Sequence, residues 1–155
     1  MKKRTLILVL IFVPLLAIQF VPVGRANPSV THEVDAPSDA LAVLRRSCFD
    51  CHSNTTKWPW YSYVAPMSWF VADHVRDGRR HMNFSEWDHL DADVQAHLIA
   101  EVWEEVSEGE MPLTSYLLLH GSARLSDDDR HTLQHWAEVS GATIGGAHTH
   151  YEDDD

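Results

Sequence analysis

The chain has two cysteines, Cys48 and Cys51, which are separated by two residues and followed directly by His52. Two cysteines cannot build a disulfide framework, so they are interpreted as a local chemical motif. Residues three apart on a helix face the same side, so both thiols can add to the vinyl groups of one haem, while the histidine offers its imidazole to the iron. C-x-x-C-H is the attachment motif of c-type haem. The motif therefore predicts one covalently attached haem c, bound through Cys48, Cys51 and the iron ligand His52.

The same two cysteines admit two other interpretations. C-x-x-C also occurs in dithiol redox sites and in zinc sites. A redox site usually lies at the start of a helix near a βαβ pattern, whereas these cysteines end a helical pattern and no sheet is predicted nearby. A structural zinc site would need a second pair of ligands, and the chain has no further cysteine. Haem attachment is the favoured interpretation, and the other two remain open.

A second iron ligand is predicted among the methionines that follow the motif. Electron-transfer cytochromes commonly fill the sixth position with a methionine sulfur, which raises the reduction potential. Met111 follows the helix-ending Gly109 and precedes Pro112, which biases it away from helical backbone. We therefore expect Met111 to be the sixth ligand and His52 to be the fifth. The alternatives are Met67, Met82, a histidine such as His81 or His120, and an open sixth position.

The N-terminal segment, residues 1–26, is interpreted as a membrane anchor or signal sequence. A short basic stretch precedes an uncharged apolar run over residues 5–23. As a helix this run spans about 28 Å, close to the hydrocarbon thickness of a bilayer. The basic flank predicts a cytoplasmic N-terminus and a periplasmic body. An uncleaved anchor in the inner membrane is favoured over a cleaved signal, because the run is long and Gly24-Arg25-Ala26 is a poor cleavage site.

The rest of the chain is predicted to form a small all-α, cytochrome c-like domain. Residues 27–38 contain two prolines and are interpreted as a linker, residues 39–141 as the haem-binding domain, and residues 142–155 as a disordered acidic tail. Periodicity and capping signals predict helices at 39–52, from Pro66 to Gly78, at 92–108 and at 127–139. The residues expected to be buried on the last two helices are Val94, Leu98, Val102, Val106, Leu133, Trp136 and Ala137.

The charge of the chain limits the kinds of partner that it can bind. The net charge is −11, and four of the twelve basic residues lie within the first 25 positions. A strongly acidic body argues against nucleic acid, which requires a cationic binding surface. It favours association with a redox partner protein that has a basic docking face.

Several short stretches resemble the bacterial haem-binding domain family of small, single-haem cytochrome c-like proteins. They are Cys48-Phe49-Asp50-Cys51-His52-Ser53-Asn54, Trp58-Pro59-Trp60-Tyr61, Pro66-Met67-Ser68-Trp69, Asn83-Phe84-Ser85-Glu86-Trp87 and Gly109-Glu110-Met111-Pro112. The resemblance covers nearly the whole chain, from Ile18 to Trp136, and implies covalent haem, export and electron transfer. The Met-Pro pair also resembles the sixth-ligand loop of class I cytochromes c, although Leu113 stands where those proteins often have a second proline.

Two functions follow from these observations. The favoured one is a periplasmic electron carrier with iron ligated by His52 and Met111, without enzymatic activity. The alternative is a haem enzyme accessory or a gas or redox sensor with an open or displaceable sixth ligand. One haem motif and no recognisable catalytic pair favour the carrier.

Overall fold

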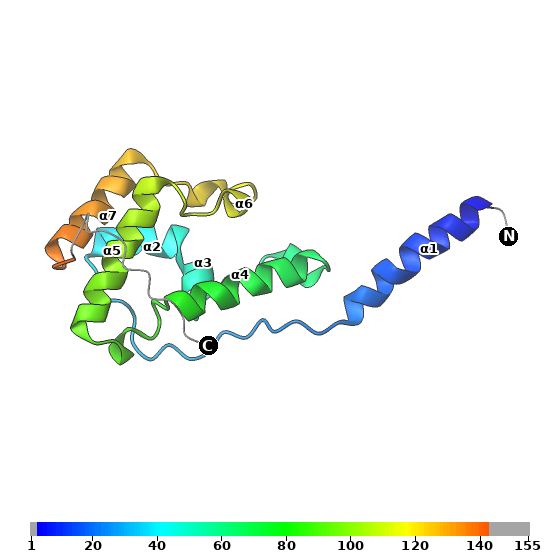
Figure 1. Ribbon diagram of the computed structural model, residues 1–155, viewed down its shortest axis with the longest axis horizontal. Coiled ribbons are helices and arrows are strands. Elements are labelled where there is room, and N and C mark those ends of the chain that lie inside the picture. Colours follow the sequence, from blue (N-terminus) through cyan, green and yellow to red (C-terminus); the bar gives the residue numbers. More distant parts are fainter. Residues whose placement is uncertain (1–2, 143–155) are drawn as a thin grey trace. The chain divides into compact units, whose positions relative to one another are not determined.

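The computed structural model describes residues 3–142, and these form helices joined by loops (Figure 1). The α-helices are α1 (Lys3–Ala17), α2 (Ser38–Ser47), α3 (Phe49–His52), α4 (Met67–His81), α5 (Ala92–Glu108), α6 (Thr114–Leu117) and α7 (Asp127–Val139). Short 3-10 helices lie between them: η1 (Ile18–Phe20), η2 (Trp60–Tyr63), η3 (Trp87–His89) and η4 (Gly121–Ala123). Residues 3–142 contain no strand, only an isolated bridge between His32 and Glu86, so the all-α prediction is confirmed.

The described chain divides into two compact units. The first unit comprises the residues up to Val30 together with Phe49–Ser85, and the second comprises Thr31–Cys48 together with the residues from Glu86 onward. The change from one unit to the other therefore falls inside the C-x-x-C-H motif, between Cys48 and Phe49. Each unit is described separately below.

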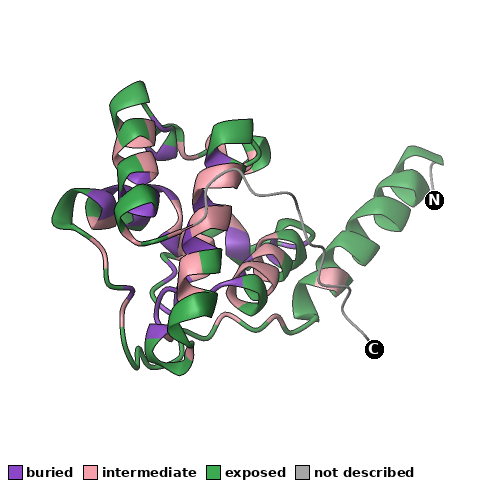
Figure 2. Cartoon of the chain, turned by 60° about the vertical axis from the view of Figure 1, so that its left-hand side comes forward, coloured by how far each residue is buried: buried purple, intermediate pink, exposed green. Residues whose placement is uncertain are grey.

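The first unit contains α1, α3 and α4. The helical stretch Lys3–Phe20 is long and apolar enough to cross a membrane, and none of it is buried, as the exposed colouring of α1 in Figure 2 shows. An apolar helix that contacts no protein core is compatible with an anchor or a signal sequence. In the rest of the unit, α3 and η2 both pack against α4. The unit thus places every motif residue except Cys48 on α3, which packs against α4.

The second unit packs α2 and α5 against α7. Its core consists of fully or almost fully buried apolar side chains, among them Leu44, Val102, Val106, Leu133 and Trp136. Helix α7 begins with a capping box: the Ser126 side chain accepts from the Asp129 amide, and the Asp129 side chain accepts from the Ser126 amide. Helix α5 ends at Gly109 in the left-handed conformation, as expected, with φ of 80°.

The predicted helix over residues 39–52 is wrong in one respect, because it consists of two helices. Cys48 has φ of −121° and ψ of −34°, which ends α2, and α3 begins at the next residue. The apolar spacing of the sequence continues through this position, so periodicity could not reveal a change at one residue. The buried face of α2 consists of Ala40, Val43, Leu44 and Ser47, whereas Leu41 is only half-buried.

Two further expectations need correction. Gly78 does not end the second predicted helix, since α4 continues to His81. Val94 was expected on the buried face of α5 but is 43% exposed, because the core side of that helix begins at Leu98. Leu133, Trp136 and Ala137 are buried on α7 as predicted.

The segment predicted as a linker, residues 27–38, is non-helical up to Pro37 and makes hydrogen bonds within each unit, and Ser38 is the first residue of α2. In the first unit the Asn27 side chain donates to the Thr56 carbonyl at 2.9 Å and accepts from Trp58 Nε1 at 3.2 Å. In the second unit the Trp87 amide donates to the His32 carbonyl at 3.0 Å, and Val34 is buried. Residues 143–155, which make up almost all of the predicted acidic tail, lie outside the described residues.

Candidate functional site

The cysteine motif occupies the end of α2 and the whole of α3. Cys48 follows the last residue of α2, and its amide donates to the Leu44 carbonyl at 2.8 Å. Cys51 and His52 are the last two residues of α3, and all three motif side chains are half-buried. The structure therefore supports Cys51 and His52 from the first unit and Cys48 from the second.

Gly78 brings α4 unusually close to the motif. A Cβ atom added at Gly78 would lie 2.9 Å from the Cys51 carbonyl oxygen and 3.2 Å from the Cys51 Cβ. Glycine in a helix interior is less favourable than alanine by roughly 1 kcal/mol, so its presence here needs a packing reason. That reason is the close approach of α3, because any larger residue at position 78 would collide with the Cys51 backbone.

The imidazole of His52 is oriented by the chain that follows α4. Its Nδ1 lies 3.2 Å from the carbonyl oxygen of Met82. When Nδ1 carries the proton and donates to this oxygen, the lone pair of a neutral imidazole is on Nε2. The ring also lies against Phe84, with centroids 6.2 Å apart, and Phe84 is fully buried. The Met82 carbonyl and the Phe84 ring thus hold the imidazole of His52 in one orientation.

Phe84 also joins the beginning of α3 to the segment after α4. It stacks on Phe49 with ring centroids 5.3 Å apart and an interplanar angle of 17°. Its amide donates to the His52 carbonyl at 2.8 Å. These contacts hold both ends of α3, a helix of a single turn that would not be stable alone.

Hydrogen bonds also join the residues directly after the motif to the segment that follows α4. The Asn54 amide donates to Ser85 Oγ at 2.9 Å, and Asn83 Nδ2 donates to Asn54 Oδ1 at 3.0 Å. Ser53 Oγ donates to the Phe49 carbonyl at 2.7 Å. Ser53, Asn54 and Ser85 are all buried, so these bonds satisfy polar groups that would otherwise be costly to bury.

Arg79 fastens the loop after the motif to the segment that follows α1. Its guanidinium donates to the carbonyls of Ser53 and Ala26 at 2.8 Å each, to Thr56 Oγ1 at 2.8 Å and to Asn27 Oδ1 at 2.9 Å. Arginine suits this task because its planar group carries five donors in a fixed arrangement. One side chain of α4 therefore joins three segments of the first unit: α4 itself, the loop after the motif and the segment that follows α1.

Burial sets the protonation of both motif side chains in the first unit. Burial, reinforced by the Asp50 carboxylate and partly opposed by Arg79, raises the pKa of the Cys51 thiol to about 11. Burial also lowers the pKa of His52, an effect that the Met82 carbonyl partly opposes and the neighbouring His81 reinforces. At neutral pH the site therefore presents a protonated thiol and a neutral imidazole.

The predicted sixth ligand lies in the second unit. Met111 is half-buried in the non-helical segment after Gly109, and its amide donates to the Glu105 carbonyl at 3.1 Å. Of the alternatives, Met67 is 40% exposed at the start of α4, whereas Met82 is 8% exposed. The ring of His120 stacks on Tyr116 with centroids 4.0 Å apart, and His81 is exposed at the end of α4.

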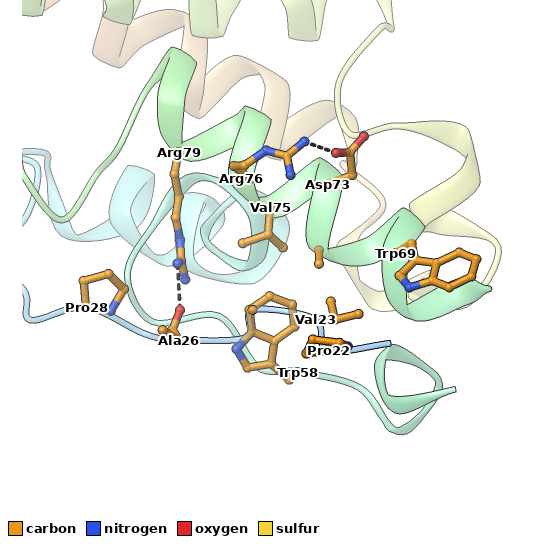
Figure 3. A pocket seen from close by; sticks show the side chains of 12 residues that line it. Pro22, Val23, Ala26, Pro28, Trp58, Trp69, Asp73, Val75, Arg76 and Arg79 are labelled. Atoms are coloured by element: carbon orange, nitrogen blue, oxygen red, sulfur yellow. Dashed lines mark hydrogen bonds and ion pairs between the residues drawn. The ribbon is translucent and has the colours of Figure 1, made fainter. Parts of the chain in front are cut away.

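A groove of about 520 Å³ lies in the first unit between α4 and the segment that follows α1 (Figure 3). Its walls are mainly apolar and include Pro22, Val23, Trp58, Trp69 and Val75. Arg79 and Ala26, which are joined by a hydrogen bond, also line the groove. So do Arg76 and Asp73, which form an ion pair. Neither Cys51 nor His52 lines this groove.

Sequence patterns alone missed several residues that position the motif. Gly78, Phe84, Asn54, Asn83 and Arg79 act through contacts with residues that are distant in the chain. The runs Ser53-Asn54 and Asn83-Phe84-Ser85 belong to the stretches that carry the family resemblance, and this was the available signal for them. Among residues 3–142 no group of three or more histidine, cysteine or carboxylate side chains could hold a metal ion.

Comparison with known proteins gives one match. A family model described as a haem-binding domain matches residues 13–139. No curated protein and no solved structure matches significantly. The match covers the end of α1, the cysteine motif and every later helix of the described residues.

Proposed function

The chain belongs to the haem-binding domain family, and from this premise we propose that it is a membrane-tethered c-type cytochrome that carries electrons in the periplasm. In this proposal the thiols of Cys48 and Cys51 would each add across one vinyl group of a single haem, which would form two thioethers and need no other reactant. His52 and Met111 would be the protein ligands of the iron. The bound haem would supply a reversible one-electron Fe(III)/Fe(II) couple.

The observation that best supports this proposal is the orientation of His52. Histidines that ligate metals nearly always donate their second ring nitrogen to a carbonyl or carboxylate, which fixes the tautomer and the ring direction. His52 Nδ1 lies 3.2 Å from the Met82 carbonyl, so Nε2 would be the ligating atom. The lowered pKa of the imidazole favours the neutral form that a metal requires.

The protonation of Cys51 bears on the dithiol alternative. Catalytic dithiols depend on a thiolate whose pKa lies below that of free cysteine. The pKa of Cys51 is instead raised to about 11 by burial and by Asp50. This favours a thiol consumed once during attachment over one that must ionise in every redox cycle.

Met111 is proposed as the sixth ligand partly because Met82 is poorly suited to that role. The carbonyl of Met82 lies 3.2 Å from His52 Nδ1, so Met82 contacts the ring at the nitrogen that would not bind the iron. Met111 lies on a non-helical segment between Gly109 and Pro112, away from that contact in the chain.

We propose that the N-terminal helix is retained, because residues that cleavage would remove make hydrogen bonds to the rest of the first unit. Cleavage after Ala26 would remove Gln19, whose amide bonds both backbone groups of Ala65, and Arg25, which donates to the Ser62 carbonyl. It would also remove the Ala26 carbonyl that accepts from Arg79. A signal peptide that is discarded has no need of such bonds, so they favour an uncleaved anchor with the body outside the cytoplasm.

Spectra of the protein matured with the haem-attachment machinery test this proposal. Met111→Leu is expected to remove the far-red band of methionine-ligated ferric haem, to lower the reduction potential and to let the reduced protein bind carbon monoxide. Met82→Leu is the matched control and should leave all three properties unchanged.

Two results would contradict the proposal in different ways. A denatured polypeptide with no haem absorption and an unmodified mass would rule out covalent attachment. Rapid carbon monoxide binding by the wild-type reduced protein would indicate an open sixth position and favour a sensor or an enzyme accessory over a carrier.

A further inference from the structure

We propose that the first unit has a membrane-contacting surface, formed by η2 and the first turn of α4, which inserts into the headgroup region of the bilayer that α1 spans. This surface, termed the aromatic corner, exposes six large apolar side chains. They are Trp60 (78% exposed), Tyr63 (59%), Val64 (46%), Met67 (40%), Trp69 (37%) and Phe70 (46%). The inference rests on the proposed anchoring by α1, and it does not depend on the haem.

The aromatic corner is tied directly to the end of the apolar helix. Gln19 Oε1 accepts from the Ala65 amide at 2.9 Å, and Gln19 Nε2 donates to the Ala65 carbonyl at 3.2 Å. Arg25 donates to the Ser62 carbonyl at 3.1 Å, and its guanidinium carbon lies 4.4 Å from the centre of the Tyr63 ring. Gln19, near the end of the apolar stretch, and Arg25, after it, thus bond the loop between η2 and α4 and η2 itself.

These bonds fix the depth of the aromatic corner relative to the membrane. The helical stretch Lys3–Phe20 has 18 residues. It is therefore about 27 Å long, close to the thickness of the hydrocarbon layer. Gln19 lies at the outer end of this stretch, so a loop bonded to its amide group must lie at the membrane interface.

The composition of the aromatic corner is typical of that interface. Residues 58–72 carry no charged side chain, and this is the longest uncharged run after Arg25 in a chain with a net charge of −11. Tryptophan and tyrosine are enriched where a bilayer meets water, because their rings combine an apolar body with a polar group. The corner can therefore approach anionic lipids without the repulsion expected of the acidic parts of the chain, and Arg25 beside it can pair with a phosphate.

Photo-crosslinking of the full-length holoprotein in liposomes tests this proposal. The vesicles contain phosphatidylethanolamine and phosphatidylglycerol, with a small fraction of phospholipid that carries a diazirine near the headgroup. After irradiation, lipid adducts are mapped by mass spectrometry. Adducts are expected within residues 58–72, at a yield at least about fivefold above that on residues 111–123, the segment that exposes Leu118 and Leu119.

Two charge substitutions make the test specific. Trp60→Glu is expected to lower the adduct yield on residues 58–72 about fivefold, since a carboxylate disfavours insertion. Leu118→Glu introduces the same charge at a side chain that is 79% exposed in the second unit, and it should leave that yield unchanged. Both replaced side chains are exposed, so neither variant disturbs the core.

The possible outcomes distinguish failure of the aromatic corner from failure of the proposed membrane anchor and of the proposed cytochrome function. Adducts on residues 3–20 without adducts on 58–72 would overturn the aromatic corner while leaving the anchor intact. Adducts on neither segment would overturn both. Loss of the haem spectrum with adducts on 58–72 retained would count against the cytochrome assignment alone, and the membrane surface would stand.

Discussion

At the scale of single residues, the motif is positioned by groups that have no redox chemistry of their own. Gly78 allows the Cys51 backbone to contact α4, and the Met82 carbonyl orients His52. Phe84 fills the space beside the imidazole and is fully buried. These neighbours hold Cys51 and His52 in a fixed arrangement, on which the proposed haem attachment would depend.

Replacing Gly78 by alanine should destabilise the protein although alanine is the better helix residue. The new Cβ would meet the Cys51 carbonyl oxygen at 2.9 Å, so α3 must shift. We expect a loss of about 1–3 kcal/mol in the free energy of unfolding, measured with denaturant, together with a lower yield of attached haem.

Gly121→Ala is the matched control for this substitution. A Cβ at Gly121 meets no atom within 4 Å. Its effect should stay within about 0.5 kcal/mol. Equal stability of the two variants would show that α4 does not press against the motif as described.

At the scale of secondary structure elements, α7 illustrates how local signals build the second unit. Ser126 and Asp129 form its capping box, and Asp129 also accepts from Arg46 on α2 at 2.7 Å. Burial alone would raise the pKa of Asp129, but the hydrogen bonds from Arg46 and Ser126 lower it below its usual value. One carboxylate therefore both begins a helix and joins it to its neighbour.

Because its pKa is lower in the folded state, Asp129 should stabilise the protein in a pH-dependent way. Its contribution is fully present above the unfolded pKa of about 3.9 and is lost as the pH falls through the folded value. Asp129→Asn is expected to cost about 1 kcal/mol of unfolding free energy near pH 7, and the difference from wild type should shrink towards about pH 3.

Asp128→Asn provides the control for the general effect of charge at the start of the helix. It removes a carboxylate from the same first turn, where it interacts with the same helix dipole. Thermal unfolding across this pH range measures both variants. A penalty for Asp129→Asn that does not change with pH would argue against the ion pair with Arg46.

The sequence predicted those elements whose signals are local and missed those features that depend on tertiary contact. The amphipathic pattern over 92–108 and the capping box at Ser126 correspond to α5 and α7 as observed. The break at Cys48 and the continuation of α4 past Gly78 were missed, because each depends on how α3 is held. The candidate site shows the same division: the motif made Cys51 and His52 candidates, but it gave no indication of the partners that orient them.

At the scale of the whole molecule, charge is unevenly distributed along the chain. The acidic parts would contact a basic partner, and the uncharged part would contact a membrane. The net charge of −11 comes from 23 acidic residues against 12 basic ones. Residues 58–72 contain none of these charges. A carrier with this distribution would be steered toward a basic partner while its uncharged corner remains at the bilayer.

Electron transfer to a basic partner should therefore slow as salt is added. With a basic soluble cytochrome as the partner, the second-order rate constant is expected to fall about tenfold between roughly 10 mM and 200 mM ionic strength. Stopped-flow absorbance measures the rate. An acidic redox protein of similar potential is the control, and its rate should rise over the same range. A salt-independent rate with the basic partner would contradict electrostatic steering.

The Arg79 side chain has a practical consequence for producing a soluble form of this protein. Shortening the chain to begin at Asn27 would delete one of the guanidinium's acceptors, together with the residues that hold the loop before α4. Such a shortened protein should hold the loop that follows the cysteine motif less firmly, even if every residue of the motif is present. A better design replaces the apolar side chains of residues 5–16 with polar ones and retains everything from Gln19 onward.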